Sequence, residues 1–274
     1  PIIQIEEFAK IQNQENILLI EAGSSRENYA KKHLENAFYL DLNEDLSEVP
    51  DNPKNGGRHP LPKIKNFAET LQKIGAKTDS HFIIYDDKNG ANAAARLWWM
   101  LRSVGLQKVQ VLNGGLQTAE KFGLKTTSEI PVSKEGEILE LLEFQLPQKN
   151  LEEVKDASIK KDKITIDVRE TARYNGETEP IDLVAGHIPN AINIPFATNL
   201  DENGLFKSPK ILKTYYSQFL ENKKLEDIIV HCGSGVTACH TLLAMDYAGL
   251  EIPNLYVGSW SEWSRNDLEI SKNN

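Results

Sequence analysis

Cysteine is scarce in this chain, as are long apolar runs. Only Cys232 and Cys239 occur among 274 residues, too few for a disulfide framework, so we expect the reducing environment of the cytoplasm. Fully apolar runs are as short as ILLI at 17–20, far below the length of a membrane span. The chain opens on PIIQIEEFAK, a fold-like pattern, and we expect no targeting leader. The sequence therefore predicts a cytoplasmic protein that contacts no membrane.

Basic residues are also fewer than acidic residues. The chain has 31 Lys and Arg against 40 Asp and Glu, a formal net charge of −9, and a pI near 5.3. This balance disfavours nucleic acid and anionic membranes as partners, because both would repel the protein. An anionic ligand would need local arginines and backbone N–H groups. With 40% hydrophobic and 26% charged residues the chain is globular, and its length suits two domains.

The chain contains one pattern twice. The strand-like NILLIEA (16–22) and the KKHLENAFYLDLN that follows correspond to KITIDVRE (163–170) and AGHIPNAINIPF. HFIIYDDKNGANAAARLWWMLRSVGL (81–106) likewise corresponds to DIIVHCGSGVTACHTLLAMDYAGL (227–250). Strands that alternate with amphipathic helices predict an α/β fold, with a mostly parallel sheet flanked by helices in each half. The repeated pattern spans about half of the chain. A repeat of this length indicates a duplicated domain, because the repeats of a solenoid are much shorter.

The predicted boundaries follow composition. We expect a first domain over 1–130, a linker over 131–141 and a second domain over 142–274, because the polar KTTSEIPVSKEGE separates the halves. The Pro- and Gly-rich segment 47–62 is predicted to be a long loop within the first domain. Long ordered loops are often functional, so His59 and Arg58 within this one need an explanation.

A thiol ends one of the predicted strands. Strand DIIV delivers Cys232 to the carboxyl edge of the sheet, where ligands bind in open α/β folds. Gly233 and Gly235 permit a tight turn whose N–H groups face inward, and the following helix adds partial positive charge. Such a nest stabilises a thiolate, which is a nucleophile, and would also stabilise a persulfide.

The two cysteines allow three other interpretations. Cys239 lies inside an apolar helix and is predicted to be core, and Cys232 could also be a buried strand end. A metal site is disfavoured, because seven helical residues place Cys239 roughly 10 Å from Cys232 and a tetrahedral zinc needs four close ligands. A phosphatase loop needs a Cys, five intervening residues and then an Arg, and this chain has Ala238 at the place of that Arg.

These residues carry a resemblance. CGSGVTA (232–238) resembles the active-site loop of the 3-mercaptopyruvate sulfurtransferases of the rhodanese superfamily, whose thiosulfate-using relatives carry basic residues at the places of Gly233 and Ser234. Further matching segments are GGRHPLP (56–62), ANAAARLWWML (91–101), IDVRETARYNGETEPIDLVAGHIPNAINIPF (166–196) and YVGSWSEW (256–263). The resemblance implies two tandem rhodanese-like domains, the first inactive because Asp86 stands where the second has Cys232.

The resemblance also implies roles for residues. Cys232 is the nucleophile, Ser234 and His59 form a proton-delivering pair, and Arg173 binds the anionic donor. The loop residues implied to bind substrate are Gly233, Gly235, Val236 and Thr237.

Other matched positions are predicted to be structural or depart from the family. The acidic partner of His59 does not carry over, since Asp41, Asn43 and Glu44 all lie near its place. Ile181 stands where many relatives have a second substrate arginine. Arg169 is predicted to pair with Asp167 or Asp182 within its domain. His187 and its repeat His33 are predicted to stabilise turns.

The expected function is transfer of sulfur from 3-mercaptopyruvate through a Cys232 persulfide to a thiol, thioredoxin-like or small, or to cyanide. No metal and no organic cofactor is expected. The loop offers Gly233 and Ser234 in place of cations, which favours mercaptopyruvate over thiosulfate. A thiosulfate sulfurtransferase and a non-catalytic persulfide-binding module remain the alternatives, and the second would need neither Arg173 nor a proton donor.

Overall fold

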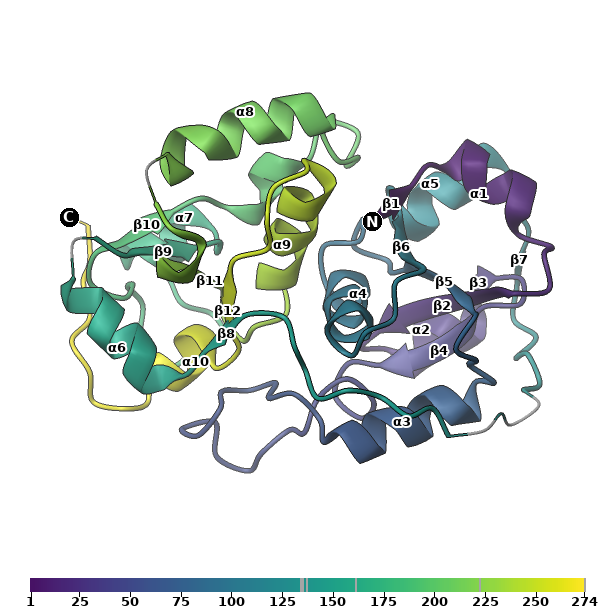
Figure 1. Cartoon of the computed structure of the whole chain (residues 1–274), viewed down its shortest axis with the longest axis horizontal. Helices are drawn as coiled ribbons and strands as arrows, with labels where there is room; N and C mark the ends of the chain where they lie inside the picture. Colours follow the sequence, from purple (N-terminus) through teal and green to yellow (C-terminus); the bar gives the residue numbers. More distant parts are fainter. Residues whose placement is uncertain (134–135, 137, 161, 222, 274) are drawn as a thin grey trace. The chain divides into compact units, whose positions relative to one another are not determined.

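A computed structural model describes residues 1–133, 136, 138–160, 162–221 and 223–273, and the chain forms two compact units (Figure 1). The first comprises Pro1–Glu48, Leu61–Gln145 and Glu202–Phe206, and the second comprises Val49–Pro60, Leu146–Asp201 and the chain from Lys207 on. Within the described residues, no helix has the length and apolar character needed to cross a membrane.

The first unit is built on a parallel sheet with the strand order β1-β6-β5-β2-β4. A short antiparallel pair, β3 and β7, lies outside it. The elements of this unit are β1 (Ile2–Ile3), α1 (Ile5–Ile11), β2 (Ile17–Gly23), α2 (Arg26–Lys31), β3 (His33–Leu34), β4 (Phe38–Asp41), α3 (Ile64–Lys73), β5 (His81–Tyr85), α4 (Ala93–Ser103), β6 (Val109–Leu112), α5 (Gly115–Phe122) and β7 (Thr126–Thr127).

The second unit repeats this order as β8-β12-β11-β9-β10, again with parallel neighbours. Its elements are β8 (Gln148–Lys149), α6 (Leu151–Ile159), β9 (Ile164–Asp167), α7 (Thr171–Asn175), β10 (Ala191–Asn193), the 3-10 turn η1 (Phe196–Asn199), α8 (Pro209–Leu220), the 3-10 turn η2 (Leu225–Asp227), β11 (Ile228–His231), α9 (Ala238–Tyr247), β12 (Asn254–Tyr256) and α10 (Ser259–Trp263). The predicted duplicated α/β fold is confirmed.

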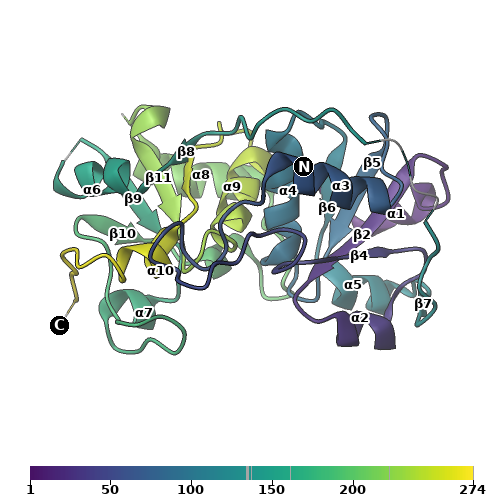
Figure 2. The same ribbon diagram turned by 90° about the horizontal axis from the view of Figure 1, so that it is seen from below.

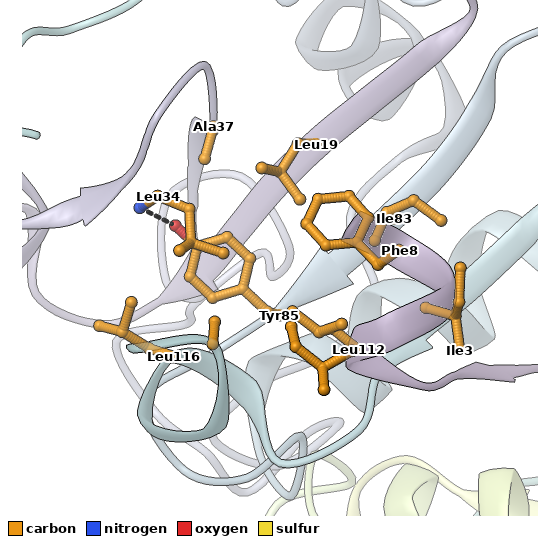
Figure 3. Packing of buried hydrophobic residues seen from close by; sticks show 11 residues of the cluster. Ile3, Phe8, Leu19, Leu34, Ala37, Ile83, Tyr85, Leu112 and Leu116 are labelled. Carbon is orange, nitrogen blue, oxygen red and sulfur yellow. Dashed lines mark hydrogen bonds between the residues drawn. The ribbon is translucent and has the colours of Figure 1, made fainter. Parts of the chain in front are cut away.

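Helices cover both faces of each sheet. In the first unit, α1 and α5 pack on one face, where Phe8, Leu19, Ile83 and Leu116 share a core (Figure 3). Tyr85 lies in the same core, and its hydroxyl accepts a hydrogen bond from the N–H of Leu34 at 3.0 Å. In the second unit, residues of α6, α7 and α10 pack around β11 and β12, and α8 lies against α9 (Figure 1, Figure 2).

The repeated histidines have structural positions, as predicted. His33 stacks on Tyr29 and its Nδ1 is 2.7 Å from the Tyr29 carbonyl oxygen. His187 stacks on Tyr174 in the same way, with its Nδ1 2.8 Å from the Tyr174 carbonyl oxygen. Three residues beyond each histidine, an asparagine adopts a positive φ of 65° or 61° and turns the chain into the next strand.

The boundaries of the two compact units differ from the predicted domain boundaries. Residues 138–145 pack on the first unit, where the Phe144 ring lies 6.1 Å from that of Trp99 and the Gln145 N–H bonds to the Ser103 carbonyl at 2.9 Å. The predicted re-entry into the second domain begins only at β8. Part of the predicted linker, at 134, 135 and 137, lies outside the described residues.

The segment Val49–Pro60, predicted to be part of a long loop within the first domain, packs in the second compact unit. The Gly56 N–H donates to Glu262 Oε1 at 2.7 Å, and the Arg58 N–H donates to Ser261 Oγ at 3.0 Å. The Asn266 side chain also donates to the Lys54 carbonyl at 2.8 Å. These bonds join the segment to α10 and the residues after it, which no local sequence pattern could indicate.

In the first unit, a carboxylate occupies the loop that follows the central strand β5. Asp86 is fully buried, and its oxygens accept backbone N–H groups from Lys88, Gly90, Asn92 and Ala94 at 2.7–3.2 Å. Burial raises the pKa of Asp86, and the four N–H bonds oppose that rise. The loop is an anion-binding nest that holds an anion of its own chain.

We predict that Asp86→Asn lowers the free energy of unfolding by about 1–3 kcal/mol, because an amide NH2 would replace an oxygen that accepts backbone N–H groups. Asp87→Asn is the matched control, since that side chain is 44% exposed and its loss should change stability by less than about 0.5 kcal/mol. Urea unfolding followed by circular dichroism measures both. Equal stability of the two variants would contradict the structural role of Asp86.

Candidate functional site

Cys232 follows the central strand of the second sheet. Strand β11 lies between β9 and β12, and its β-branched and apolar residues are buried on both faces. Cys232 is 3% exposed and comes directly after His231, whose carbonyl oxygen accepts the Val168 N–H at 3.0 Å. Cys232 therefore lies at the carboxyl edge of the sheet, as the sequence predicted.

The first residues of the loop are held by the start of α10. The Cys232 N–H donates to Ser259 Oγ at 3.2 Å, and the Cys232 carbonyl accepts the Trp260 N–H at 3.0 Å. The Gly233 carbonyl accepts the Ser261 N–H at 2.8 Å. Ser259 adopts a positive φ of 54°, which is unusual outside glycine. The segment YVGSWSEW thus supports the loop, a role that the sequence did not reveal.

Glycine is required at the turn of this loop. Gly235 has φ +72°, and a Cβ there would lie 2.4 Å from the Val257 carbonyl oxygen. Beyond it, the carbonyls of Val236 and Thr237 accept N–H groups of Cys239 and His240 as α9 begins. Cys239 is fully buried, and its Sγ is 3.4 Å from the Gly235 carbonyl oxygen, so its predicted core position is confirmed.

His59 and Ser234 lie together. The Nδ1 of His59 is 2.8 Å from Ser234 Oγ, although 175 positions separate the two residues in the sequence. Ser234 is buried and His59 is half-buried. The packing of Val49–Pro60 on α10 brings these two side chains together. Ser234 follows Cys232 by two positions in the sequence.

Asp41, one of the residues expected near the place of the acidic partner of His59, makes its described hydrogen bonds within the first unit. Its Oδ1 accepts the N–H groups of Asn43 and Glu44, and its Oδ2 accepts the Tyr39 hydroxyl at 3.0 Å. Its carboxylate therefore stabilises its own turn. Glu44 is exposed and pairs with Arg26 at 3.4 Å.

Arg173 lies in a chain of ion pairs beside the loop. It belongs to α7, and its Nη2 is 2.7 Å from Glu179 Oε1 and 3.4 Å from Asp182 Oδ2. Arg169 completes the other end, with its Nη2 2.6 Å from Asp167 Oδ2 and its Nη1 3.1 Å from Glu179 Oε2. The predicted pairing of Arg169 with Asp167 is confirmed, and its guanidinium also lies 4.5 Å from the ring centre of Trp260.

The chain of ion pairs ends at Asp182, whose buried carboxylate receives three guanidiniums. Arg58 Nε lies 3.1 Å from Asp182 Oδ1, and Arg265 Nη1 lies 3.0 Å from the same oxygen. Arg173 supplies the third. A buried carboxylate needs such partners, because desolvation otherwise opposes its charge.

Two carboxylates in this chain of ion pairs, those of Glu179 and Asp167, have lowered pKa values. Burial raises the pKa of Glu179, but the hydrogen bonds from Arg173 and from backbone N–H groups outweigh it and lower the pKa. For Asp167, burial again opposes ionisation, and the nearby positive charge, including Arg169, holds the pKa below its usual range. Both carboxylates are therefore ionised at neutral pH.

Two guanidiniums reach the Cys232 loop. A Cβ on Gly233 would lie 3.1 Å from Arg58 Nη2 and 3.5 Å from Arg173 Nη2. The loop itself carries Gly233 and Ser234 in place of cations, and the fold brings Arg58 close to it in addition to the expected Arg173. Ile181 does not contribute, since its side chain is 54% exposed. Arg58 and Asp182 are the residues that sequence reasoning missed as parts of the site; the unexplained GGRH motif was the available signal.

Known proteins resemble this chain over most of its length. The family model of the rhodanese-like domain matches residues 4–120 and 150–266. The chain is 38% identical over 247 residues to a probable 3-mercaptopyruvate sulfurtransferase of Pseudomonas aeruginosa, covering 86% of this chain and 82% of the relative. It is 32% identical over 249 residues to the thiosulfate sulfurtransferase of Gallus gallus, covering 89% and 82%.

A solved structure is also similar over nearly the whole chain. The 3-mercaptopyruvate sulfurtransferase SseA from Escherichia coli superposes with a TM-score of 0.78 at 32% identity, and the match covers 95% of this chain and 99% of SseA.

We predict that Gly57→Ala loosens the segment Val49–Pro60. Gly57 has φ +79°, and a Cβ there would lie 2.3 Å from the Gly258 carbonyl oxygen, so the segment must move off α10. Amide hydrogen exchange of residues 54–59 should accelerate at least ~10-fold. Gly249→Ala is the control, because Gly249 has φ +71° with no atom within 4 Å. Exchange in this segment that is no faster in Gly57→Ala than in Gly249→Ala would contradict its displacement by the collision.

Proposed function

Because the chain belongs to the rhodanese-like domain family, we propose that it is a 3-mercaptopyruvate sulfurtransferase that carries sulfur as a persulfide on Cys232. The observation that carries the proposal is the Ser234–His59 pair, 2.8 Å apart, on the loop that begins with Cys232. A thiol, a proton donor and two nearby guanidiniums are what this reaction requires.

The reaction proceeds in two steps. The Cys232 thiolate attacks the thiol sulfur of 3-mercaptopyruvate, a new S–S bond forms, and the C–S bond of the donor breaks with its electron pair leaving as the enolate of pyruvate. Protonation of the enolate carbon releases pyruvate. An acceptor thiolate or cyanide then attacks the outer sulfur of the persulfide and regenerates the Cys232 thiolate.

Ser234 and His59 deliver the proton. With the hydroxyl and the ring nitrogen at hydrogen-bond distance, His59 can pass a proton to Ser234 as Ser234 gives its own to the departing enolate. Proton transfer by positioned groups contributes about 10²–10⁴-fold in enzymes. A non-catalytic persulfide-binding module would need no such pair, and this disfavours that alternative.

The loop stabilises the negative charge. The first unit supports this role for Gly233, Gly235, Val236 and Thr237, because its corresponding loop directs four N–H groups at the Asp86 carboxylate. Asn89 and Gly235, at corresponding positions, both adopt a positive φ. In the second unit the same backbone arrangement would serve a thiolate or persulfide. The first unit is inactive in this proposal, since a carboxylate carries no sulfane sulfur and already fills its nest.

Arg173 binds the anionic end of the donor. Its Nη2 lies near Gly233, and its bonds to Glu179 hold the guanidinium in position. Thiosulfate is the second candidate donor, and the specific observation in its favour is the pair of guanidiniums near Gly233. Thiosulfate is a dianion, and its leaving sulfite needs no proton.

The remaining parts of the proposal concern partners and location. The donor is a small molecule, and the acceptor is a thioredoxin-like or low-molecular-weight thiol, or cyanide. No metal or organic cofactor is needed for the two steps. The net charge of −9 disfavours nucleic acid, and a thiol-dependent reaction suits the cytoplasm.

We predict that Cys232→Ser abolishes transfer, because a hydroxyl does not ionise near neutral pH and carries no sulfane sulfur. Cys239→Ser is the control and should retain most activity, with some loss of stability from a buried hydroxyl. Mass spectrometry after incubation with donor should show one added sulfur on Cys232. An unmodified enzyme during turnover, or equal inactivation of both variants, would exclude the single-nucleophile mechanism.

We predict a kcat/KM for 3-mercaptopyruvate at least ~10-fold above that for thiosulfate, equivalent to about 1.4 kcal/mol, because only mercaptopyruvate uses the proton from Ser234. Ser234→Ala should reduce mercaptopyruvate turnover at least ~10-fold and leave thiosulfate turnover within about twofold. Steady-state kinetics with both donors measures this. Equal losses would remove the proton-delivery role, and a thiosulfate preference in the parent protein would overturn the donor assignment.

A further inference from the structure

His231 is a buried residue next to the nucleophile to which the proposed mechanism gives no role. It ends β11, directly before Cys232, and its side chain is fully buried. Its Nδ1 lies 3.1 Å from the Cys232 carbonyl oxygen, whereas its Nε2 lies 3.7 Å from Asp167 Oδ2, beyond hydrogen-bond distance. Within the part of the chain that the structure describes, Nε2 has no hydrogen-bond partner. The hydrogen bond that the ring does make is to the backbone of Cys232.

This carbonyl partner decides which ring nitrogen carries the proton. Burial lowers the pKa of His231 more than the nearby Asp167 carboxylate raises it, so the imidazole is neutral at neutral pH and has one N–H. A carbonyl oxygen only accepts hydrogen bonds, so Nδ1 is the donor and Nε2 is the bare nitrogen. The opposite tautomer would point a lone pair at the carbonyl oxygen. His231 is therefore a hydrogen-bond donor to Cys232.

The Cys232 carbonyl receives two donors. Besides His231 Nδ1, it accepts the Trp260 N–H at 3.0 Å. A carbonyl oxygen has two lone pairs, so both are used, and the plane of the peptide between Cys232 and Gly233 is held from two sides. This peptide is trans, so its N–H points away from its carbonyl. Fixing the carbonyl therefore also fixes the direction of the Gly233 N–H.

The first unit provides an internal comparison for this contact. Tyr85 corresponds to His231, because each ends the central strand of its sheet. Each is also in register with an acidic residue of the neighbouring strand, Glu21 for Tyr85 and Asp167 for His231. The two positions are therefore equivalent in the backbone, and only their side chains differ.

The second donor is absent from the described part of the first unit. The Asp86 carbonyl accepts the Leu116 N–H at 3.1 Å, which matches the bond from α10 to the Cys232 carbonyl. The Tyr85 hydroxyl, however, bonds to the Leu34 N–H and not to the Asp86 carbonyl. The additional donor thus occurs on the loop that carries the thiol and not on the loop that closes on its own carboxylate.

The fixed N–H groups are the ones that a sulfur anion can use. Among the described residues, the N–H groups of Gly233 and Ser234 donate to no protein acceptor. The Gly233 carbonyl accepts the Ser261 N–H at 2.8 Å, and this fixes the Ser234 N–H in the same way. Successive N–H groups held in one direction form an anion-binding nest.

We propose that His231 is a positioning residue for sulfur transfer, whose Nδ1–H holds the Cys232 carbonyl and thereby keeps the Gly233 N–H directed at the anionic sulfur. The inference rests on the proposed function and concerns a residue that acts through the backbone, because neighbouring side chains of a strand point to opposite faces. The ring takes no proton from the reaction. A buried Nε2 without a partner is unfavourable, and the contact made by Nδ1 accounts for keeping a histidine here.

The test compares His231→Asn with His231→Gln, two amides that place their N–H donors differently. The Asn nitrogen can take the place of Nδ1, whereas the Gln nitrogen reaches toward the place of Nε2. In His231→Gln, the pH of half-maximal alkylation of Cys232 by iodoacetamide should rise by at least ~0.5, because a less well directed N–H stabilises the thiolate less. In His231→Asn it should rise by less than ~0.2. Mass spectrometry of the alkylated peptides separates Cys232 from Cys239.

The sizes of the two side chains distinguish positioning from packing. Asn is smaller than Gln and leaves the larger cavity in place of the ring, so a role in packing alone would make His231→Asn the more perturbed variant. Equal shifts of the two alkylation profiles, a larger shift in His231→Asn, or an unchanged profile in His231→Gln would each overturn the proposal.

A measurement on the parent protein applies even if one variant fails to fold. Nitrogen-15 NMR of the histidine rings should show His231 protonated at Nδ1 and bare at Nε2 between about pH 6 and 8, and the signal missing from the folded variant identifies this ring. A proton on Nε2 alone would overturn the proposal.

Steady-state kinetics separates this role from the proposed function. With 3-mercaptopyruvate, His231→Gln should lower kcat at least ~10-fold and change KM less than about threefold, while His231→Asn should stay within about threefold in both. A parent protein that transfers no sulfur, but whose variants show the expected alkylation profiles, would overturn the proposed function alone. A parent protein that transfers sulfur, with kcat no lower in His231→Gln than in His231→Asn, would overturn the role of His231.

Discussion

The need to neutralise one buried carboxylate, that of Asp182, organises the second unit. Its oxygens accept guanidiniums from α7, from the segment Val49–Pro60 and from the residues after α10. An unpaired charge at this depth would be strongly destabilising, so the three segments are stable only where they meet. They meet beside Gly233, and the position of every proposed functional group around Cys232 depends on that convergence.

The two units use one backbone device in two ways. In the first, the loop after the central strand closes on Asp86, whose carboxylate satisfies four N–H groups of the same loop. In the second, the corresponding position is Cys232, a smaller group that is neutral as a thiol and negative as a thiolate or persulfide. Replacing an internal carboxyl group by a reactive thiol converts a structural loop into a proposed catalytic loop.

Two consecutive residues, Arg58 and His59, bring a guanidinium and an imidazole to this loop. Arg58 faces Asp182 and Gly233, while His59 faces Ser234. Both depend on the same anchoring bonds to Ser261 and Glu262, so the segment Val49–Pro60 places them as one unit. The Arg58 guanidinium and the His59 imidazole are therefore positioned by the packing of a single segment.

The sequence by itself determined the duplicated α/β fold, the position of Cys232 at the sheet edge and the core position of Cys239, because these follow from local periodicity and glycine placement. It also indicated the Ser234–His59 pair through resemblance. Only the tertiary structure decided that Val49–Pro60 belongs to the second unit and that Arg58 reaches Gly233. Those contacts join residues separated by more than a hundred positions, such as Arg58 and Asp182, and depend on buried charge pairing that leaves no periodic signal in the chain.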